Sequence, residues 1–269
     1  MPTLRSDDAV LYYDVSGSGP DVVLLHPFPL NHHFWDAIVP SLSDRYRVIT
    51  PDLRGYGDSE LGDGTATMEK HAADLLRLCE AEGVNKAVFV GVSIGGYALF
   101  EFWRRRPEQF AGLVLSNTRA SADDQESRAN RLRVADQVLR DGTGAFIEDM
   151  LGKLLGSTTW SERPEVVEAA RRMMQAMSAE DIASIQRGMA DRPDSTGTLS
   201  MIDVPTLVIA GEEDIPPRRA AELMRDGIAG STLRVIPRAG HYAALERPEE
   251  YSKLLRGFVD EIYSDSRGQ

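Results

Sequence analysis

The chain has 269 residues, and its 42 acidic and 30 basic side chains give a formal net charge of −12. This acidic balance argues against nucleic acid or an anionic membrane surface as the partner. Cys79 is the single cysteine, so no internal disulfide can form and no cysteine metal site is expected. The sequence contains no apolar run of about 18 residues and no apolar secretion signal at its start, so we expect a cytoplasmic protein that does not enter a membrane.

Short apolar runs alternate with helical patterns in the first third of the chain. Two strands are expected within residues 3–15, and the apolar runs at 21–25 and 46–50 predict further strands. Helices are expected after Trp35 to about Leu42 and over residues 68–82. This alternation predicts an α/β fold, with a mostly parallel central sheet flanked by helices.

A sharp turn is predicted at Gly91-Val92-Ser93-Ile94-Gly95, between a buried strand at 86–90 and a helix that ends before Pro107. In that context the pattern G-x-S-x-G is typical of a nucleophile elbow, a strained turn that lifts a serine hydroxyl clear of the sheet. The helix N-terminus behind the serine offers free N–H groups to a developing oxyanion. The structural alternative is a Gly/Ser-rich turn of an ordinary α/β protein.

Helical patterns replace the alternation after Thr118. Residues 119–198 contain no convincing strand and predict helices over 127–140, 143–155, 164–177 and 179–190. We interpret this stretch as an inserted helical cap, with residues 1–118 and 199–269 forming the core. Its methionines either line a substrate cavity or, as we prefer for most of them, pack the insert itself. Strands are expected again at 204–211 and 232–236, with helices over 217–226 and 247–262.

Three predicted strands carry a serine, a carboxylate and a histidine at or just beyond their carboxyl ends, which are Ser93, Asp214 and His241. Active sites of open α/β sheets gather at that edge. A serine hydroxyl needs a neighbouring base, imidazole can accept and return its proton, and a carboxylate fixes the imidazole tautomer. Glu212 and Glu213 remain alternatives for the carboxylate.

The other four histidines have less specific positions. His26 ends a strand and is expected to organise the loop that follows. His32 and His33 precede a helix and are either solvated or directed at the pocket. His71 is expected on a surface helix.

The sequence resembles the α/β-hydrolase superfamily, in particular its compact bacterial branch of serine esterases, enol-lactonases and cofactor-free haloperoxidase-like enzymes. The resemblance covers nearly the whole chain outside the helical insert, and it is specific for fold and triad rather than substrate. The motifs that carry it are His26-Pro27-Phe28-Pro29, Asp52-Leu53-Arg54-Gly55-Tyr56-Gly57-Asp58-Ser59, Gly91 to Gly96, Gly211-Glu212-Glu213-Asp214 and Gly240-His241.

The resemblance implies Ser93 as nucleophile, Asp214 as acid and His241 as base. It also implies an oxyanion hole made by the backbone N–H groups of Phe28 and Ile94. Proline has no N–H, so Phe28 is the one residue of 27–29 that can donate. The family usually has glycine where this chain has Pro27. The fixed φ of this proline is expected to make the loop stiffer. Phe28, Met150, Trp160 and Tyr242 are the expected substrate contacts.

We therefore expect a serine hydrolase that cleaves small to medium carboxylic esters through an acyl-enzyme and needs no cofactor or metal. A lactone hydrolase with the same triad is the near alternative. A non-catalytic small-molecule receptor on the same fold is the alternative from another class. Carbon–carbon bond hydrolysis is more distant. Related enzymes that cleave carbon–halogen bonds or epoxides have aspartate at the nucleophile position, so Ser93 argues against both reactions.

Overall fold

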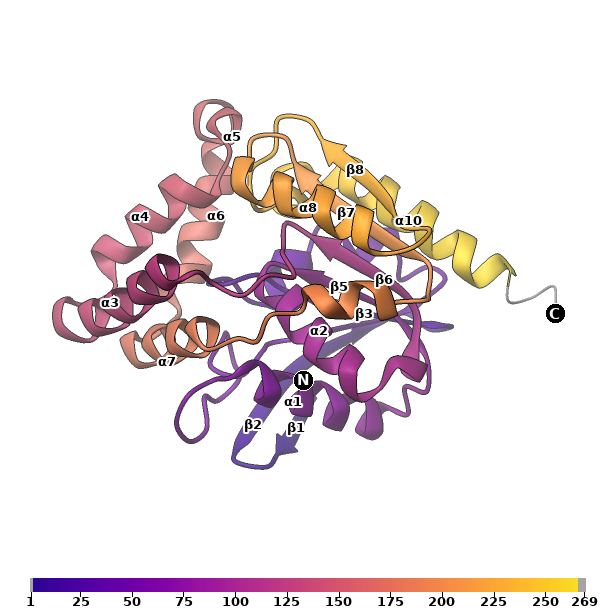
Figure 1. The fold of residues 1–269 in the computed structure, drawn as a ribbon, viewed down its shortest axis with the longest axis horizontal. Coiled ribbons are helices and arrows are strands. Elements are labelled where there is room, and N and C mark those ends of the chain that lie inside the picture. The colour runs from indigo at the N-terminus through magenta and orange to yellow at the C-terminus, as the bar shows by residue number, and fades with distance from the viewer. Residues whose placement is uncertain (1, 266–269) are drawn as a thin grey trace.

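A single eight-stranded sheet organises the computed structural model, which describes residues 2–265 (Figure 1). The strand order is β1-β2-β4-β3-β5-β6-β7-β8. The first three strands in this order pair antiparallel and the later pairs are parallel, which confirms the predicted mostly parallel sheet. The strands are β1 (Thr3–Ser6), β2 (Ala9–Ser16), β3 (Asp21–Leu25), β4 (Arg47–Pro51), β5 (Ala87–Val92), β6 (Phe110–Ser116), β7 (Thr206–Gly211) and β8 (Thr232–Ile236).

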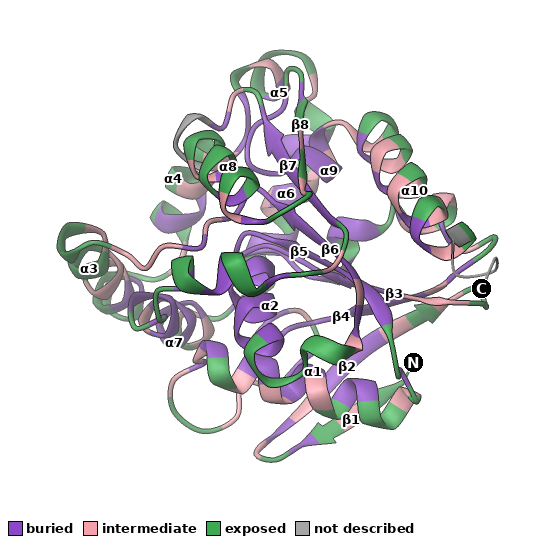
Figure 2. Ribbon diagram, turned by 45° about the vertical axis from the view of Figure 1, so that its right-hand side comes forward, coloured by how far each residue is buried: buried purple, intermediate pink, exposed green. Residues whose placement is uncertain are grey.

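Helices cover both faces of this sheet (Figures 1 and 2). One face carries α1 (Met68–Glu82), α2 (Ile94–Arg105) and α8 (Ile215–Gly227), and α10 (Pro248–Asp265) lies on the other. The short helix α9 (Ala243–Glu246) precedes α10. All six residues of β5 are buried because helices pack above and below it, which explains its unbroken apolar sequence. The ring of Phe89 lies 4.6 Å from that of Phe110 and 5.3 Å from that of Phe102.

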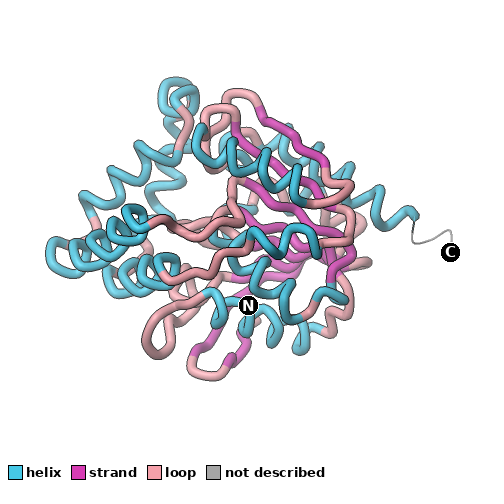
Figure 3. The backbone as a smooth tube through the Cα atoms, in the orientation of Figure 1, coloured by secondary structure: helices cyan, strands magenta, loops and turns pink. Residues whose placement is uncertain are grey.

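Five helices lie between β6 and β7, beyond the carboxyl edge of the sheet (Figure 3). They are α3 (Gln125–Asp141), α4 (Gly144–Leu154), α5 (Ser157–Glu162), α6 (Pro164–Gln175) and α7 (Ala179–Ala190). Within this segment α3 packs on α7 and α4 packs on α6. The chain enters this segment after β6 and leaves it before β7. The entering and leaving stretches of chain lie side by side, and the Ser195 N–H donates to the Ala120 carbonyl at 2.8 Å.

The structure corrects several expectations about the elements. The helix expected between Trp35 and Leu42 is replaced by a short 3-10 turn at Val39–Ser41, because Pro40 cannot continue a helical hydrogen-bond ladder. Another 3-10 turn, which was not expected, precedes it at His32–Trp35. Two further 3-10 turns, at Pro107–Gln109 and Thr196–Met201, and the six-residue helix α5 were also not expected. Such elements are too short to show a helical period. Residues 1 and 266–269, assigned to the core by the sequence, lie outside the described residues.

No helix in the described range 2–265 is both long and apolar enough to cross a membrane.

Candidate active site

The turn between β5 and α2 forces Ser93 into an uncommon backbone conformation. Its φ is +53° and its ψ is −114°, a region that costs a residue with a side chain about 1–3 kcal/mol. Small neighbours make the turn possible. A Cβ on Gly91 would lie 2.6 Å from the Gly95 carbonyl carbon, and a Cβ on Gly95 would lie 2.7 Å from the Leu25 carbonyl oxygen. The glycines of the motif therefore let α2 begin directly against β3 and β5.

Neighbouring backbone and side-chain groups fix Ser93 at this turn. Its N–H donates to the Ser116 carbonyl at 3.0 Å, and its carbonyl accepts a 2.7 Å hydrogen bond from the Thr118 hydroxyl. Ile94 is the first residue of α2, so its N–H has no acceptor within the helix. This N–H is available to a ligand beside the serine.

Asp214 and His241 meet beyond the ends of β7 and β8. Asp214 Oδ2 lies 2.7 Å from His241 Nδ1, and both side chains are buried. A carboxylate at this distance assigns the proton to Nδ1 and leaves Nε2 as the basic nitrogen. The Asn117 amide donates to the same carboxylate oxygen at 2.7 Å and to the Gly240 carbonyl at 3.3 Å.

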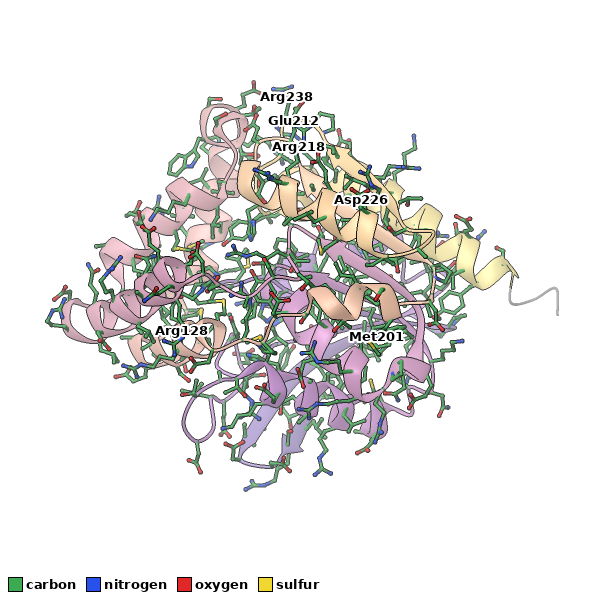
Figure 4. The ribbon with its side chains drawn as sticks, in the orientation of Figure 1. Arg128, Met201, Glu212, Arg218, Asp226 and Arg238 are labelled. Atoms are coloured by element: carbon green, nitrogen blue, oxygen red, sulfur yellow. The ribbon has the colours of Figure 1, made fainter. Side chains whose placement is uncertain are left out.

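The two alternative carboxylates have other partners. Glu213 accepts hydrogen bonds from the Thr158 N–H at 2.9 Å and the Ser157 hydroxyl at 3.1 Å. Glu212 is exposed, and its carboxylate accepts a hydrogen bond from the Arg238 N–H at 3.0 Å. Figure 4 shows Glu212 and Arg238 at the edge of the molecule. Of the three candidate acids, Asp214 is the one that contacts His241.

A cavity of about 440 Å³ joins these groups. It lies between the carboxyl edge of the sheet, the five-helix segment and α8. Ser93, Asp214 and His241 line it together, and so do the predicted substrate contacts Phe28 and Met150. The other described lining residues are Tyr97, Asn117, Thr118, Arg119, Ser121, Arg131, Lys153, Leu154, Met189, Arg219, Ala220 and Leu223.

The structure does not bring the other two predicted substrate contacts to this cavity. Trp160 on α5 is 40% exposed, and its indole N–H donates to the Leu151 carbonyl at 3.3 Å. Tyr242 is fully buried, and its hydroxyl donates to the Phe28 carbonyl at 3.0 Å. Tyr242 thus positions the loop that carries Phe28 and does not face a ligand.

His26 organises the same loop, as the sequence indicates. Its Nε2 accepts the Leu53 N–H at 3.0 Å, and its Nδ1 lies 3.1 Å from the Pro27 carbonyl. Burial lowers the pKa of His26 to about 4, so the ring is neutral at neutral pH. Two loops at the edge of the sheet are thereby joined through one imidazole.

His32 and His33 line a separate cavity of about 550 Å³, between the 3-10 turn they begin and α6. Ser93 is not among the described residues that line it. His32 is buried and its Nδ1 lies 2.9 Å from Asp52, whereas His33 is exposed. His71 corrects a further expectation, because it occupies the inner face of α1 and is fully buried.

Two important residues were missed by the sequence interpretation. Asn117 follows β6, the strand between β5 and β7, and a polar residue at that edge is a signal that could have been used. Glu246 gives no local signal. Its buried carboxylate accepts the N–H groups of Gly156, Gly240 and Tyr242 at 2.9–3.1 Å and the Thr159 hydroxyl at 2.6 Å. It therefore ties the loop of His241 to the five-helix segment.

Among residues 2–265, no group of three or more histidine, cysteine, aspartate or glutamate side chains is arranged to hold a metal ion.

Comparison with known proteins identifies the family. The family model described as alpha/beta hydrolase fold matches residues 20–248. The chain belongs to the α/β-hydrolase family. It is a hydrolase, which confirms the class of enzyme that the sequence predicts.

Individual α/β-hydrolases resemble the chain over almost its full length. It is 25% identical over 246 residues to 3-oxoadipate enol-lactonase 1 of Acinetobacter baylyi, with 91% of this chain and 90% of that protein covered. The malate-bound structure of a thermophilic esterase from Thermogutta terrifontis is 39% identical, with a TM-score of 0.93 and 97% and 98% of the two chains covered. Est816, described as an N-acyl homoserine lactone degrading enzyme, is 30% identical, with a TM-score of 0.81 and 96% and 100% covered.

Proposed function

We propose that this α/β-hydrolase is a serine esterase that cleaves small to medium carboxylic esters through a Ser93–His241–Asp214 triad. The observation that carries the proposal is the meeting of the three side chains at one cavity, with the Asp214–His241 contact at 2.7 Å. A cavity of about 440 Å³ lies within the usual size range of small-molecule sites. The esterase among the similar structures supports the same class of substrate.

Catalysis begins when His241 Nε2 takes the proton of Ser93 Oγ as the oxygen attacks the ester carbonyl. The N–H groups of Phe28 and Ile94 donate to the oxyanion of the tetrahedral intermediate. The carbon–oxygen bond to the alcohol then breaks, and His241 gives its proton to the departing oxygen. A water deprotonated by His241 attacks the acyl-enzyme, which releases the carboxylic acid and restores Ser93.

The five-helix segment acts in this proposal as a cap over the site. Residues 119–198 form the cap, and the described residues of the two flanking segments, 2–118 and 199–265, form the catalytic core. Met150 and Met189 reach the cavity from the cap side, whereas Met174 and Met177 are buried within the segment and Met173 lines the second cavity.

A lactone hydrolase with the same triad is the second candidate. The enol-lactonase and the homoserine lactone degrading enzyme among the relatives favour it. The chemistry is unchanged, but the leaving oxygen stays attached to the acyl group.

The test is a series of p-nitrophenyl esters from acetate to dodecanoate, with a lactone beside them. Wild type is compared with Ser93→Ala and with Ser200→Ala, which changes an exposed serine outside the cavity. We expect Ser93→Ala to lose at least about 10⁴-fold in kcat while Ser200→Ala keeps full activity. Turnover of the lactone alone selects the second candidate. Ligand-induced stabilisation without turnover selects the receptor alternative, and full activity in folded Ser93→Ala contradicts both enzyme candidates.

A further inference from the structure

The active-site cavity is cationic although the whole chain carries a charge of −12. Four basic side chains line it: Arg119, Arg131, Lys153 and Arg219. Among the described lining residues the one carboxylate is Asp214, which is already hydrogen-bonded to His241 and Asn117. The sign of the local charge is therefore the reverse of that of the molecule.

Two of these four side chains, Arg119 and Arg131, belong to an arginine cluster around Asp123. The Asp123 carboxylate is buried and pairs with three guanidinium groups, of Arg131 at 2.5 Å, Arg192 at 2.9 Å and Arg119 at 3.3 Å. The three guanidinium groups share this one buried carboxylate, and Asp194 adds a weaker attraction for Arg192 from the surface. Asp124 adds a weaker attraction for Arg119 from the surface. The Arg119 side chain is 37% exposed and lines the cavity, so its guanidinium group can be reached by a further anion.

The cluster lies close to the nucleophile. Tyr97 is one helical turn beyond Ser93 on α2, and Arg119 follows the Thr118 whose hydroxyl holds the Ser93 carbonyl. Arg119 and Tyr97 both line the cavity, and the Arg192 guanidinium lies 4.4 Å from the centre of the Tyr97 ring. Burial alone raises the pKa of the Tyr97 phenol, but the three arginines outweigh burial and lower it. The direction of this shift agrees with the gathering of arginines around Tyr97.

We propose that Arg119 and Arg131 form a subsite for a carboxylate on the substrate, so that the enzyme prefers esters or lactones that carry a free carboxylate. This inference rests on the proposed function. Guanidinium groups bind carboxylates through paired, charge-assisted hydrogen bonds, which suits a dicarboxylic acid monoester with its scissile carbonyl at Ser93. Arg219 adds a further positive charge to the cavity lining, whereas Lys153 is paired with Asp149 at 2.7 Å.

The competing explanation is a structural clamp. Arg131 lies on α3 and Arg192 follows α7, so Asp123 also ties these helices together. Arg119 is the residue that separates the two explanations. Its removal leaves Asp123 paired with Arg131 and Arg192, so the clamp survives while the anion loses a partner.

The experiment compares two esters of equal length, p-nitrophenyl valerate and mono-p-nitrophenyl glutarate. We expect wild type to favour the glutarate ester in kcat/KM by at least about tenfold. Arg119→Gln is expected to lower kcat/KM for the glutarate ester by about 10- to 100-fold, mainly through KM, and to change the valerate ester by less than about twofold. Arg119→Lys keeps part of the preference. Lys86→Gln removes an exposed charge at the amino end of β5 and leaves both rates unchanged.

Two results overturn the inference. The first is a wild type that favours the neutral ester, and the second is an Arg119→Gln protein that loses both activities equally, as a damaged clamp would. If neither ester is hydrolysed, the proposed function has failed, and binding decides the inference alone. Glutarate then raises the melting temperature of wild type and not that of Arg119→Gln if the subsite exists, and raises neither if it does not.

Discussion

At the scale of single residues, two of the strained backbone positions, Ser93 and Asn117, lie at the site. Four described residues other than glycine have positive φ, namely Asp7, Ser93, Asn117 and Arg238. Ser93 and Asn117 follow the neighbouring strands β5 and β6, and Arg238 lies three residues before His241. Strain of about 1–3 kcal/mol at a residue persists only where the surroundings enforce it. Here the strained conformations fix the position of Ser93 and of the Asn117 amide, which donates a hydrogen bond to Asp214.

The first residue-scale prediction concerns Asp214. Asp214→Asn replaces the carboxylate at His241 Nδ1 with an amide, which favours the wrong imidazole tautomer and does not stabilise the imidazolium. We expect kcat on the preferred ester to fall by about 10³- to 10⁴-fold with little change in melting temperature. Asp226→Asn, on the exposed side of α8, is the matched control and keeps full activity. A loss of less than about tenfold in Asp214→Asn would remove Asp214 from the triad.

The second residue-scale prediction concerns His71 and the pH dependence of stability. Burial lowers the pKa of His71 to about 3, and within residues 2–265 neither ring nitrogen has a hydrogen-bond partner. The unfolded chain takes up a proton near pH 6.5 and the folded chain does not. The stabilisation is therefore complete above about pH 6.5 and is lost as the pH falls towards 3. At pH 5 the loss from this one group is about 2 kcal/mol.

His71→Leu removes that proton uptake, so its free energy of unfolding should fall less than that of wild type between pH 7 and pH 5, by about 2 kcal/mol. Urea unfolding at both pH values measures the difference. His26, whose pKa is also lowered, contributes equally to both proteins and cancels. His33→Gln changes an exposed ring and should behave as wild type does. Equal pH dependence in wild type and His71→Leu would contradict the assignment.

At the scale of elements, the site depends on how closely α2 approaches the sheet. Gly95→Ala would place its Cβ 2.7 Å from the Leu25 backbone oxygen and 2.9 Å from the Leu25 Cβ. Because of this overlap, α2 must move away from β3. We therefore expect the free energy of unfolding to fall by about 1–3 kcal/mol and the activity to fall as well. Gly152→Ala, in exposed α4 with open space around it, should stabilise by about 0.5–1 kcal/mol. Thermal unfolding of the two variants tests this, and equal effects would refute the close approach.

A second element-scale feature is the contact between the turn that joins α4 to α5 and the loop of His241. The His241 N–H donates to the Leu154 carbonyl at 2.8 Å, and Glu246 bonds to groups on both sides of the contact. This end of the five-helix segment is therefore fixed to the catalytic loop.

At the scale of the whole molecule, the sheet and the candidate triad could be predicted from the sequence because their signals are local. A strand buried on both faces must be apolar, as β5 is, and an elbow needs the small residues of its motif. His71 was misplaced because a helix on the surface still has an inner face. The Asp123 cluster escaped prediction because folding brings together Arg119 and Arg192, which lie far apart in the chain.

The central claim is that Ser93 forms a covalent acyl-enzyme, and the most direct measurement is the mass of the protein after reaction with a fluorophosphonate. The account predicts one adduct per chain, located by peptide mapping on the segment that contains Ser93 and missing from Ser93→Ala. The same reagent should abolish hydrolysis of the preferred ester in step with labelling. An adduct of equal yield in Ser93→Ala, or full hydrolysis by a completely labelled protein, would contradict the account.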